Sequence, residues 1–221
     1  MILEHPLSDE ERAFLDRVAA FSRDEVMPHA DDWDHDENLP REIFTKAGQI
    51  GMMGMVAPKE YGGGGMSNLT AALAIKELGK AYAALSMDIA AHNALAVGQI
   101  NRFGTEEQKK KYLPRLTSGE WIGAWALTEP SAGSDTGGIE TKGTEEGGQW
   151  RINGMEKFIT SGRTADLVVV MATTGQTGIG DQVFPRGTTL LPFRRGRHQS
   201  LLHGILLDIN GDIRELPRGL D

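Results

Sequence analysis

Two short segments of the chain combine residue types that could bind a flat, partly charged ligand. The first runs from Trp125 to Asp135 (WALTEPSAGSD) and the second from Lys157 to Gly162 (KFITSG). Each carries an aromatic side chain that can stack and a threonine hydroxyl that can form a hydrogen bond. The first adds an Ala-Gly-Ser turn, where the backbone could approach an anion closely because glycine has no side chain.

Together these two segments resemble the flavin-contacting segments of the acyl-CoA dehydrogenase family. A helical leader that ends in Phe103-Gly104-Thr105-Glu106-Glu107-Gln108 precedes them, and the resemblance covers roughly residues 5 to 174. It implies FAD as the cofactor. The residues that would contact FAD, carried over one by one from the family's motifs, are Trp125, Leu127, Thr128, Gly133, Ser134, Phe158, Ile159 and Thr160.

The resemblance also implies a role for each segment. The first three of these residues would lie against the flavin ring, while Phe158 would stack on it and Thr160 would hydrogen-bond its reactive edge. Gly133 and Ser134 would lie near the pyrophosphate, and Ser134 also near the thioester end of the substrate. No residue is expected to bind a metal.

The activity implied is the α,β-dehydrogenation of an acyl-CoA thioester to the trans-2-enoyl-CoA, an oxidoreductase reaction on a CH–CH group in fatty acid β-oxidation. Electrons would pass to an electron-transfer flavoprotein, and a complete family member would be a homo-oligomer. The family's catalytic base is a glutamate in a second helical domain, and this chain ends before such a domain could begin. We therefore expect a truncated chain that is inactive alone and contains no catalytic base.

Two alternatives stay open from the sequence. The chain could be a non-catalytic subunit that pairs with a separately encoded helical chain. It could also keep the fold and change the reaction, to that of an acyl-CoA oxidase or a flavin monooxygenase. A neighbouring reading frame that encodes a helical bundle with a glutamate would favour the first, and oxygen reactivity of the reduced flavin would favour the second.

Weaker candidates for chemistry have simpler explanations. Glu129 is the one acid between Trp125 and Ser134, yet acids at turns usually hydrogen-bond locally. His92 is more simply a core histidine than an acid. The acidic stretch around Asp31–Asp36 lacks the glycine and terminal glutamate of a calcium loop, so we expect a solvated face. The glycines at 62–65 lack the Lys-Ser/Thr of a phosphate loop.

Composition narrows the class of protein. The 221 residues include no cysteine, which excludes disulfides and thiolate chemistry. A net charge of −8 disfavours a nucleic-acid partner. The N-terminus lacks the pattern of a signal peptide, and no apolar run approaches the ~18 residues that span a bilayer. We therefore expect a cytoplasmic protein without membrane insertion.

Helices are expected over the first part of the chain, up to about residue 118. Ser8-Asp9-Glu10-Glu11 predicts a capping box, and Phe14, Val18 and Phe21 follow with the spacing of one buried helical face. Pro28 is expected to end this first helix, because proline lacks the amide that the helix requires.

Four more helices are expected before residue 118. The second covers Arg41 to Gln49, Asn68 caps the third, and Thr105-Glu106-Glu107-Gln108 predicts a capping box for the fifth. One face of the fourth helix is marked by Leu85, Ile89, Ala96 and Phe103.

After residue 118 the pattern changes to short strands. The expected strands are Ile122–Leu127, Trp150–Asn153, Glu156–Thr160 and Leu167–Met171. The fold class predicted is therefore α+β, with an N-terminal all-α helical domain followed by a small antiparallel β domain. The expected boundaries are 1–118 for the helical domain, 119–180 for the flavin-contacting middle domain and 181–221 for an atypical tail.

The tail departs from the family pattern from about Gly178 onward. Thr188 to Phe193 could form a strand, and Asn210-Gly211 could turn a hairpin between Ile205–Leu207 and Ile213. One hypothesis is a frame change near Asp181, which translation of the other two frames of the 3′ end would test.

Overall fold

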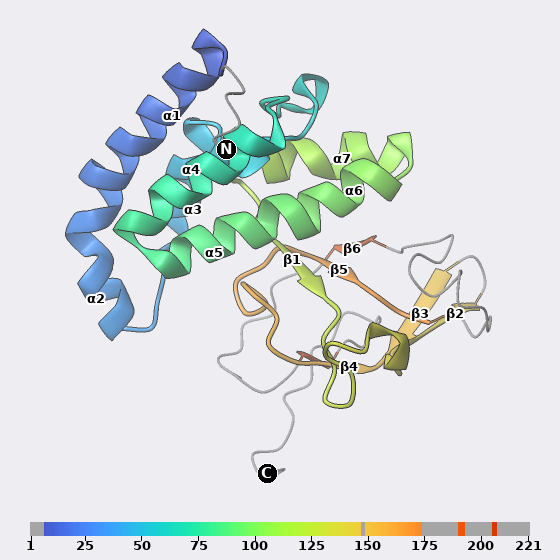
Figure 1. The fold of residues 1–221 in the computed structure, drawn as a ribbon. Helices are drawn as coiled ribbons and strands as arrows, with labels where there is room; N and C mark the ends of the chain where they lie inside the picture. The colour runs from blue at the N-terminus through green and yellow to red at the C-terminus, as the bar shows by residue number, and fades with distance from the viewer. Residues whose placement is uncertain (1–6, 147–148, 174–189, 193–204, 207–221) are drawn as a thin grey trace. The chain divides into compact units, whose positions relative to one another are not determined.

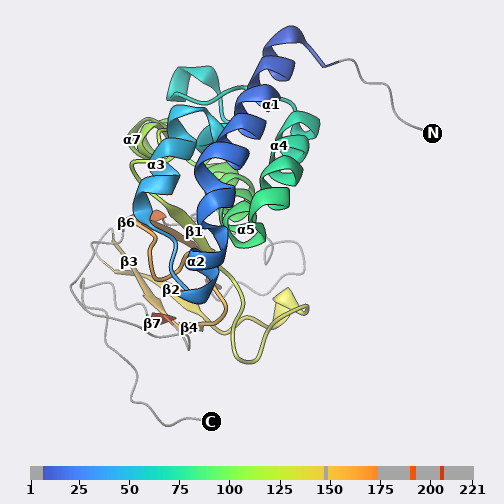
Figure 2. The ribbon, with the colours of Figure 1, turned by 90° about the vertical axis from the view of Figure 1, so that its left-hand side faces the viewer.

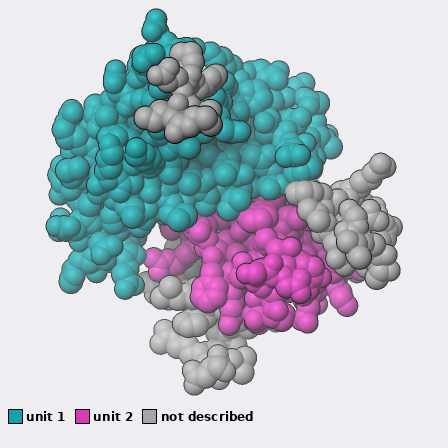
Figure 3. All heavy atoms as spheres, in the orientation of Figure 1, with its two compact units in different colours: residues 1–121 teal, residues 122–221 magenta. Residues whose placement is uncertain are grey.

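The protein is described by a computed structural model, which covers residues 7–146, 149–173, 190–192 and 205–206. The chain forms two compact units, Met1–Trp121 and Ile122–Asp221, which Figure 3 colours separately. The first unit is helical and the second contains all the described strands.

The described part of the helical unit contains seven α-helices, which short 3₁₀ or π-helical segments and turns connect. They are α1 (Asp9–Phe21), α2 (Ala30–His35), α3 (Arg41–Gln49), α4 (Asn68–Ala81), α5 (Ala83–Ala91), α6 (Gly98–Phe103) and α7 (Glu106–Thr117). None of the helices in the described part of the chain has the length and apolar character that crossing a membrane requires.

Both predicted capping boxes are present. The Ser8 hydroxyl accepts from the Glu11 amide, and the Glu11 carboxylate accepts from the Ser8 amide, at 3.2 and 3.0 Å. Thr105 and Gln108 repeat this arrangement at the start of α7. Each box satisfies two amides that have no partner within the helix.

The Glu11 carboxylate also ties α1 to α4. It accepts hydrogen bonds from the hydroxyls of Ser67, at 2.9 Å, and of Thr70. The pKa of Glu11 is lowered from 4.5 to about 2, and the hydrogen bond from Thr70 is the largest of the causes. The two helices lie side by side in both ribbon views (Figures 1 and 2). Ser67, rather than Asn68, caps α4, so the predicted cap was displaced by one residue.

The prediction that Pro28 ends the first helix was wrong. A π-helical turn at Ser22–Val26 and a 3₁₀ turn at Met27–His29 continue the helical path into α2. Pro28 lies in the first positions of the 3₁₀ turn, where a missing amide breaks no internal hydrogen bond. The predicted buried face of α1 is confirmed. The fourth predicted helix is divided into α5, a π-helical turn at His92–Val97 and α6, and its predicted face is buried except for Phe103, the last residue of α6.

Among the residues that the structure describes, the β unit has seven short strands in three small sheets. They are β1 (Gly123–Ala126), β2 (Lys142–Glu146), β3 (Gln149–Asn153), β4 (Met155–Glu156), β5 (Leu167–Val170), β6 (Leu190–Pro192) and β7 (Ile205–Leu206). The orders are β1-β5-β6, β2-β3 and β4-β7. Buried side chains from β1, β3 and β5, together with Ala165, form one core cluster, made of Ala124, Ala126, Ile152, Ala165, Val168 and Val170.

The expectation of a wholly antiparallel β unit needs correction. β1 and β5 are parallel, with Gly123 opposite Leu167 and Ala126 opposite Val170. Residues 127–166 separate these strands, which is enough chain for it to cross over and return in the same direction. The other described pairs, β2-β3, β4-β7 and β5-β6, are antiparallel.

The expected strand Glu156–Thr160 is also wrong beyond its first residue. β4 ends at Glu156, and Phe158 takes a φ of +57°, which no strand accommodates. In the tail, β6 lies within the strand predicted for residues 188–193. β7 pairs with β4, whereas the predicted Asn210-Gly211 turn and its partner Ile213 lie outside the described residues.

Candidate functional site

The two segments singled out by their residue types lie next to each other in the β unit. The first leaves β1 after Ala126, and the second follows β4 directly. The Lys157 amide donates to the Thr128 carbonyl at 2.6 Å, which joins the segments through their backbones. Residues that are about thirty positions apart in the chain therefore share one edge of the unit.

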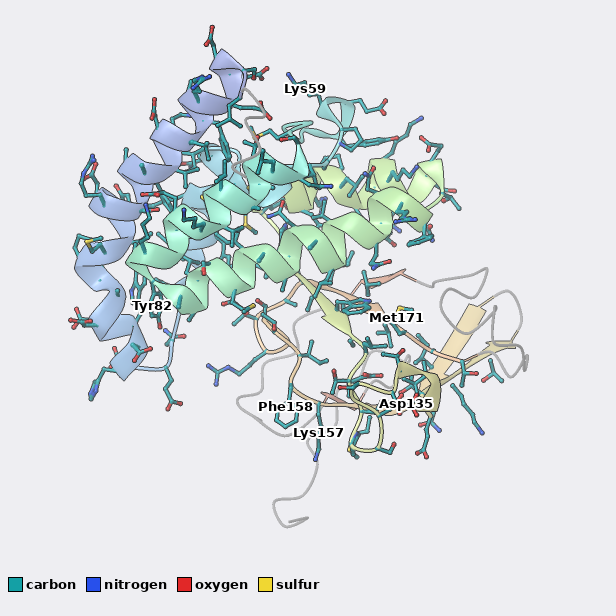
Figure 4. The ribbon with its side chains drawn as sticks, in the orientation of Figure 1. Lys59, Tyr82, Asp135, Lys157, Phe158 and Met171 are labelled. Carbon is teal, nitrogen blue, oxygen red and sulfur yellow. The ribbon has the colours of Figure 1, made fainter. Side chains whose placement is uncertain are left out.

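Phe158 stands out in the second segment. Its side chain is 85% exposed, and Figure 4 shows the ring beside Lys157, projecting from the ribbon. Its φ of +57° lies in the left-handed region, which costs a non-glycine residue about 1–2 kcal/mol. An exposed aromatic ring held in a strained backbone gains little from packing against the described residues of the unit. Such strain concentrates at ligand sites.

A tight turn fixes the backbone after Phe158. Ser161 also has a φ of +57°, and the Gly162 amide donates to the Ile159 carbonyl at 2.9 Å. Ile159 packs against the core cluster, so this side chain anchors the turn. Thr160 is half-buried between them.

Trp125 lies on the face of β1 opposite the core cluster. Side chains alternate along a strand, so Ala124 and Ala126 face the cluster while Trp125 points the other way. Its indole is half-buried, and the Nε1 atom is buried without a hydrogen-bond partner. A buried donor of this kind usually has a partner. Leu127 and Thr128, which follow, are also half-buried.

The loop with Gly133 and Ser134 is open to solvent. Both residues are exposed, and a Cβ added to Gly133 would meet no atom within 4 Å. Its neighbours hold the loop in shape, because Glu129 and Ala132 exchange backbone hydrogen bonds and Asp135 accepts from the Gly137 amide. The protein's own packing therefore does not require glycine at position 133.

Glu129 has a structural role in this loop. It is 5% exposed, and its two carboxylate oxygens accept from the amides of Glu140 and Thr141 at 2.6 and 2.8 Å. The carboxylate thus closes the loop of residues 130–139. This supports local hydrogen bonding, the simpler of the two roles considered for Glu129.

Glu156 is a residue of the site that the sequence analysis missed. It is 1% exposed, and the Thr141 hydroxyl donates to its Oε1 at 2.9 Å, while Oε2 has no partner. Burial raises the pKa of Glu156 to about 7, against the opposing effect of the Thr141 bond, and nearby Glu129 raises it further. The available signal was an acid at an inward position of a short strand, which local pattern alone does not distinguish from a solvated one.

The other candidates lie in the helical unit. His92 is buried with Nε2 3.0 Å from the Met53 carbonyl, as expected of a core histidine. Asn93 beside it donates to the Met52 carbonyl and accepts from the Met55 amide, at 2.7 and 3.0 Å. Within the described residues, no group of His, Asp and Glu side chains is arranged to hold a metal ion, the stretch at Asp31–Asp36 included.

Family models match nearly all of the described helical and β units. The N-terminal domain of acyl-CoA dehydrogenases matches residues 8–120, and the middle domain matches residues 124–192. The chain belongs to the acyl-CoA dehydrogenase family. The second match extends past Asp181 and ends at Pro192, whereas the resemblance in the sequence was followed only to about residue 174.

Similar proteins agree with this assignment. The short-chain specific acyl-CoA dehydrogenase of Clostridium acetobutylicum is 42% identical over 79% of this chain and 46% of its own. The structure of butyryl-CoA dehydrogenase from Megasphaera elsdenii has a TM-score of 0.73 at 33% identity, over 79% of this chain and 46% of that one.

A glutaryl-CoA dehydrogenase from Mycobacterium smegmatis, in complex with FADH2, also has a TM-score of 0.73 at 33% identity, over 76% of this chain and 44% of that one. The chain thus spans about half the length of the relatives it matches.

Proposed function

We propose that the chain forms the helical and flavin-contacting parts of a cytoplasmic, FAD-dependent acyl-CoA dehydrogenase. The observation that carries this proposal is Phe158, an aromatic ring displayed at 85% exposure on a strained backbone beside the Thr128 segment. The helical part would be residues 1–118, the flavin-contacting part residues 119–180, and residues 181–221 a tail of its own.

The residues present suit a flavin. Phe158 offers a face for stacking, and the buried Trp125 Nε1 is a donor without a partner. The open space around Gly133 would let main-chain amides approach a pyrophosphate, with Ser134 beside it. Bound FAD would supply the acceptor for the hydride that leaves the β-carbon of the substrate.

The remaining contacts of this proposal follow the family's motifs. Thr128 and Thr160 would donate to polar atoms on the edge of the ring, while Leu127 and Ile159 would close the apolar side of the site. Ser134 would also lie near the thioester of the acyl-CoA substrate. In the complete protein, a homo-oligomer, electrons would pass to an electron-transfer flavoprotein.

We further propose that neither acid beside the site is the catalytic base. Both Glu129 oxygens accept from backbone amides, and Glu156 is buried against Thr141. A base must reach the proton that it removes. The base would therefore come from elsewhere in the complete protein, and the chain alone should not oxidise an acyl-CoA.

The test is FAD binding by the full chain, measured by equilibrium dialysis. The wild-type chain should bind weakly, because the adenosine half would rest on a further domain and a neighbouring subunit. Phe158→Ala should weaken binding about tenfold, as expected for the loss of one stacking contact. The matched control is Met87→Ala, which also truncates an exposed apolar side chain but lies in the helical unit, away from the two segments in the sequence. Equal affinities of Phe158→Ala and wild type would refute the proposal.

A further inference from the structure

Five links join the two flavin-contacting segments into a closed ring. The backbone joins Thr128 to Glu129, and the Glu129 carboxylate binds the Thr141 amide at 2.8 Å. The Thr141 hydroxyl binds Glu156 at 2.9 Å, and the backbone leads from Glu156 to Lys157. The Lys157 amide closes the ring on the Thr128 carbonyl at 2.6 Å.

The side chains of this ring are enclosed. Glu129, Thr141 and Glu156 are 5%, 1% and 1% exposed. Gly154 makes room for Thr141, since a Cβ there would lie 1.9 Å from the Thr141 hydroxyl and 2.7 Å from its Cα. One member of the ring therefore cannot move without displacing the others, and the geometry of the ring sets the position of the backbone that enters Phe158.

The electrostatics of the ring are unusual because two carboxyls share it and no cation of the described residues pairs with either one. The ion pairs among the described residues include neither Glu129 nor Glu156. Lys142, next to Thr141, is exposed, and β7 contributes Ile205 and Leu206 opposite β4. Glu129 keeps two amide donors, whereas Glu156 has one hydroxyl donor and an oxygen without a partner.

Ionisation is therefore less favourable for Glu156 than for Glu129. A buried carboxylate with one donor beside a second carboxylate is penalised by desolvation and by repulsion. A neutral carboxyl still accepts the Thr141 hydrogen bond and leaves no charge uncompensated. The same burial holds the pKa of Glu156 near 7, far above the ordinary 4.5.

We propose that Glu129, Thr141 and Glu156 are positioning residues that hold Thr128 against the Phe158 turn, and that they do so while Glu156 carries a proton. Only one consequence of this proposal, that flavin binding depends on the Phe158 turn, rests on the proposed function. Deprotonation of Glu156 favours local opening of the ring, which releases the Lys157 amide and the backbone before Phe158.

The direction of the pH effect follows from linkage. In an opened ring Glu156 would regain a pKa near 4.5, whereas in the closed ring it is about 7. The closed ring therefore binds more protons between these values, so its stability against opening falls as pH rises from about 4.5 to 7 and levels off above. Because one proton is involved, the opening constant can rise at most about tenfold per pH unit.

Hydrogen exchange of the Lys157 amide, followed by NMR on the full chain without FAD, tests the proposal. In wild type, the protection factor should fall steeply between pH 5 and pH 7, fall by only about twofold more by pH 8 and then stay constant. Glu156→Gln, which mimics the protonated acid, should keep high protection at every pH. Glu140→Gln, which alters an exposed acid of the same loop, should behave as wild type.

Two outcomes would overturn the proposal: a wild-type protection factor that does not change with pH, or the wild-type pH dependence in Glu156→Gln. If Glu156→Gln does not fold, Thr141→Val provides the second test. It removes the hydroxyl donor at nearly constant volume and should lower Lys157 protection about fivefold at pH 5. Unchanged protection in Thr141→Val would then refute the ring.

FAD affinity, measured on the same samples, separates this proposal from the flavin assignment. If the flavin assignment fails, Phe158→Ala leaves FAD affinity unchanged while the exchange pattern persists. If the ring fails, the exchange pattern is absent while Phe158→Ala still weakens FAD binding.

Discussion

The helical unit and the β unit treat their polar and aromatic groups differently. In the helical unit, Asn93 and the Glu11 carboxylate each bond several partners, and its buried polar groups serve to join helices. In the β unit, Trp125 Nε1 and Glu156 Oε2 are buried without partners, and Phe158 is exposed. Ser22 Oγ, in a π-helical turn, is the exception in the helical unit.

This difference separates residues that stabilise the fold from residues whose unmade contacts are available to a ligand. A helix pair joined by Glu11 or Asn93 gains stability from every contact made. The strained, exposed Phe158 costs stability and contributes no packing, which makes sense where a ligand supplies the missing contacts. Replacing Phe158 should therefore raise stability, whereas removing the contacts of Glu11 or Asn93 should lower it.

The largest expected effect is at Gly154, within the β unit's framework. Gly154→Ala would drive a Cβ into Thr141, at 1.9 Å from the hydroxyl and 2.7 Å from Cα, and should destabilise the unit by about 3 kcal/mol. Gly133→Ala, where the added Cβ meets no atom, should change stability by less than about 0.5 kcal/mol. Urea unfolding measures both, and equal costs would contradict the distinction between framework and open loop.

The next largest effect is at Asn93 in the helical unit. Asn93→Leu leaves the Met55 amide and the Met52 carbonyl buried without partners, so we expect a loss of about 2–3 kcal/mol in the free energy of unfolding. Asn101→Leu on α6, at a half-buried site, is the control and should cost less than about 0.5 kcal/mol. Equal losses in the two variants would show that the Asn93 amide does not join these elements.

A smaller effect of opposite sign is expected at Phe158. Phe158→Gly removes an aromatic ring from a left-handed backbone position, which should raise stability by about 0.5–1 kcal/mol. The same variant should bind FAD less tightly than wild type. Thermal unfolding and dialysis measure the two quantities, and a variant that loses stability would show that the ring packs within the unit.

The smallest expected effect is on how the stability of each unit depends on pH. Glu11 has a pKa of about 2 in place of 4.5, so its contribution is present above about pH 4.5 and is lost as pH falls toward 2. Glu156 has the opposite sign, since its raised pKa makes the β unit lose stability as pH rises from 4.5 to about 7. The melting temperature of Glu11→Gln should fall below that of wild type at pH 6 and converge with it near pH 2. A constant difference would contradict the account.

Local signals in the sequence predicted much of the helical unit. The capping boxes at Ser8 and Thr105 and the buried face of α1 depend on residues three or four apart, so they can be recognised without tertiary information. Pro28 misled because the π-helical turn before it, which the pattern does not show, lets the helical path continue. The parallel pairing of β1 with β5 depends on contacts across some forty residues, which periodicity does not encode.

In the candidate site, residue types were predictable and geometry was not. Phe158 was placed by its motif, yet its left-handed φ and exposure contradict the strand expected for that segment. Glu156 was missed because its side chain is paired with Thr141, fifteen residues earlier, and its strand β4 pairs with β7, which is also distant in sequence. Contacts of this kind appear only when the chain has folded.

The most direct test of the central claim, that the two segments form one flavin surface, is residue-specific. A ¹⁵N-labelled full chain would be titrated with FAD and the amide chemical shifts followed by NMR. The amides of residues 125–134 and 157–162 should shift together with a single binding constant, and Phe158→Gly should weaken both responses equally. Shifts confined to one segment, different binding constants for the two, or shifts only within Met1–Trp121 would contradict the claim.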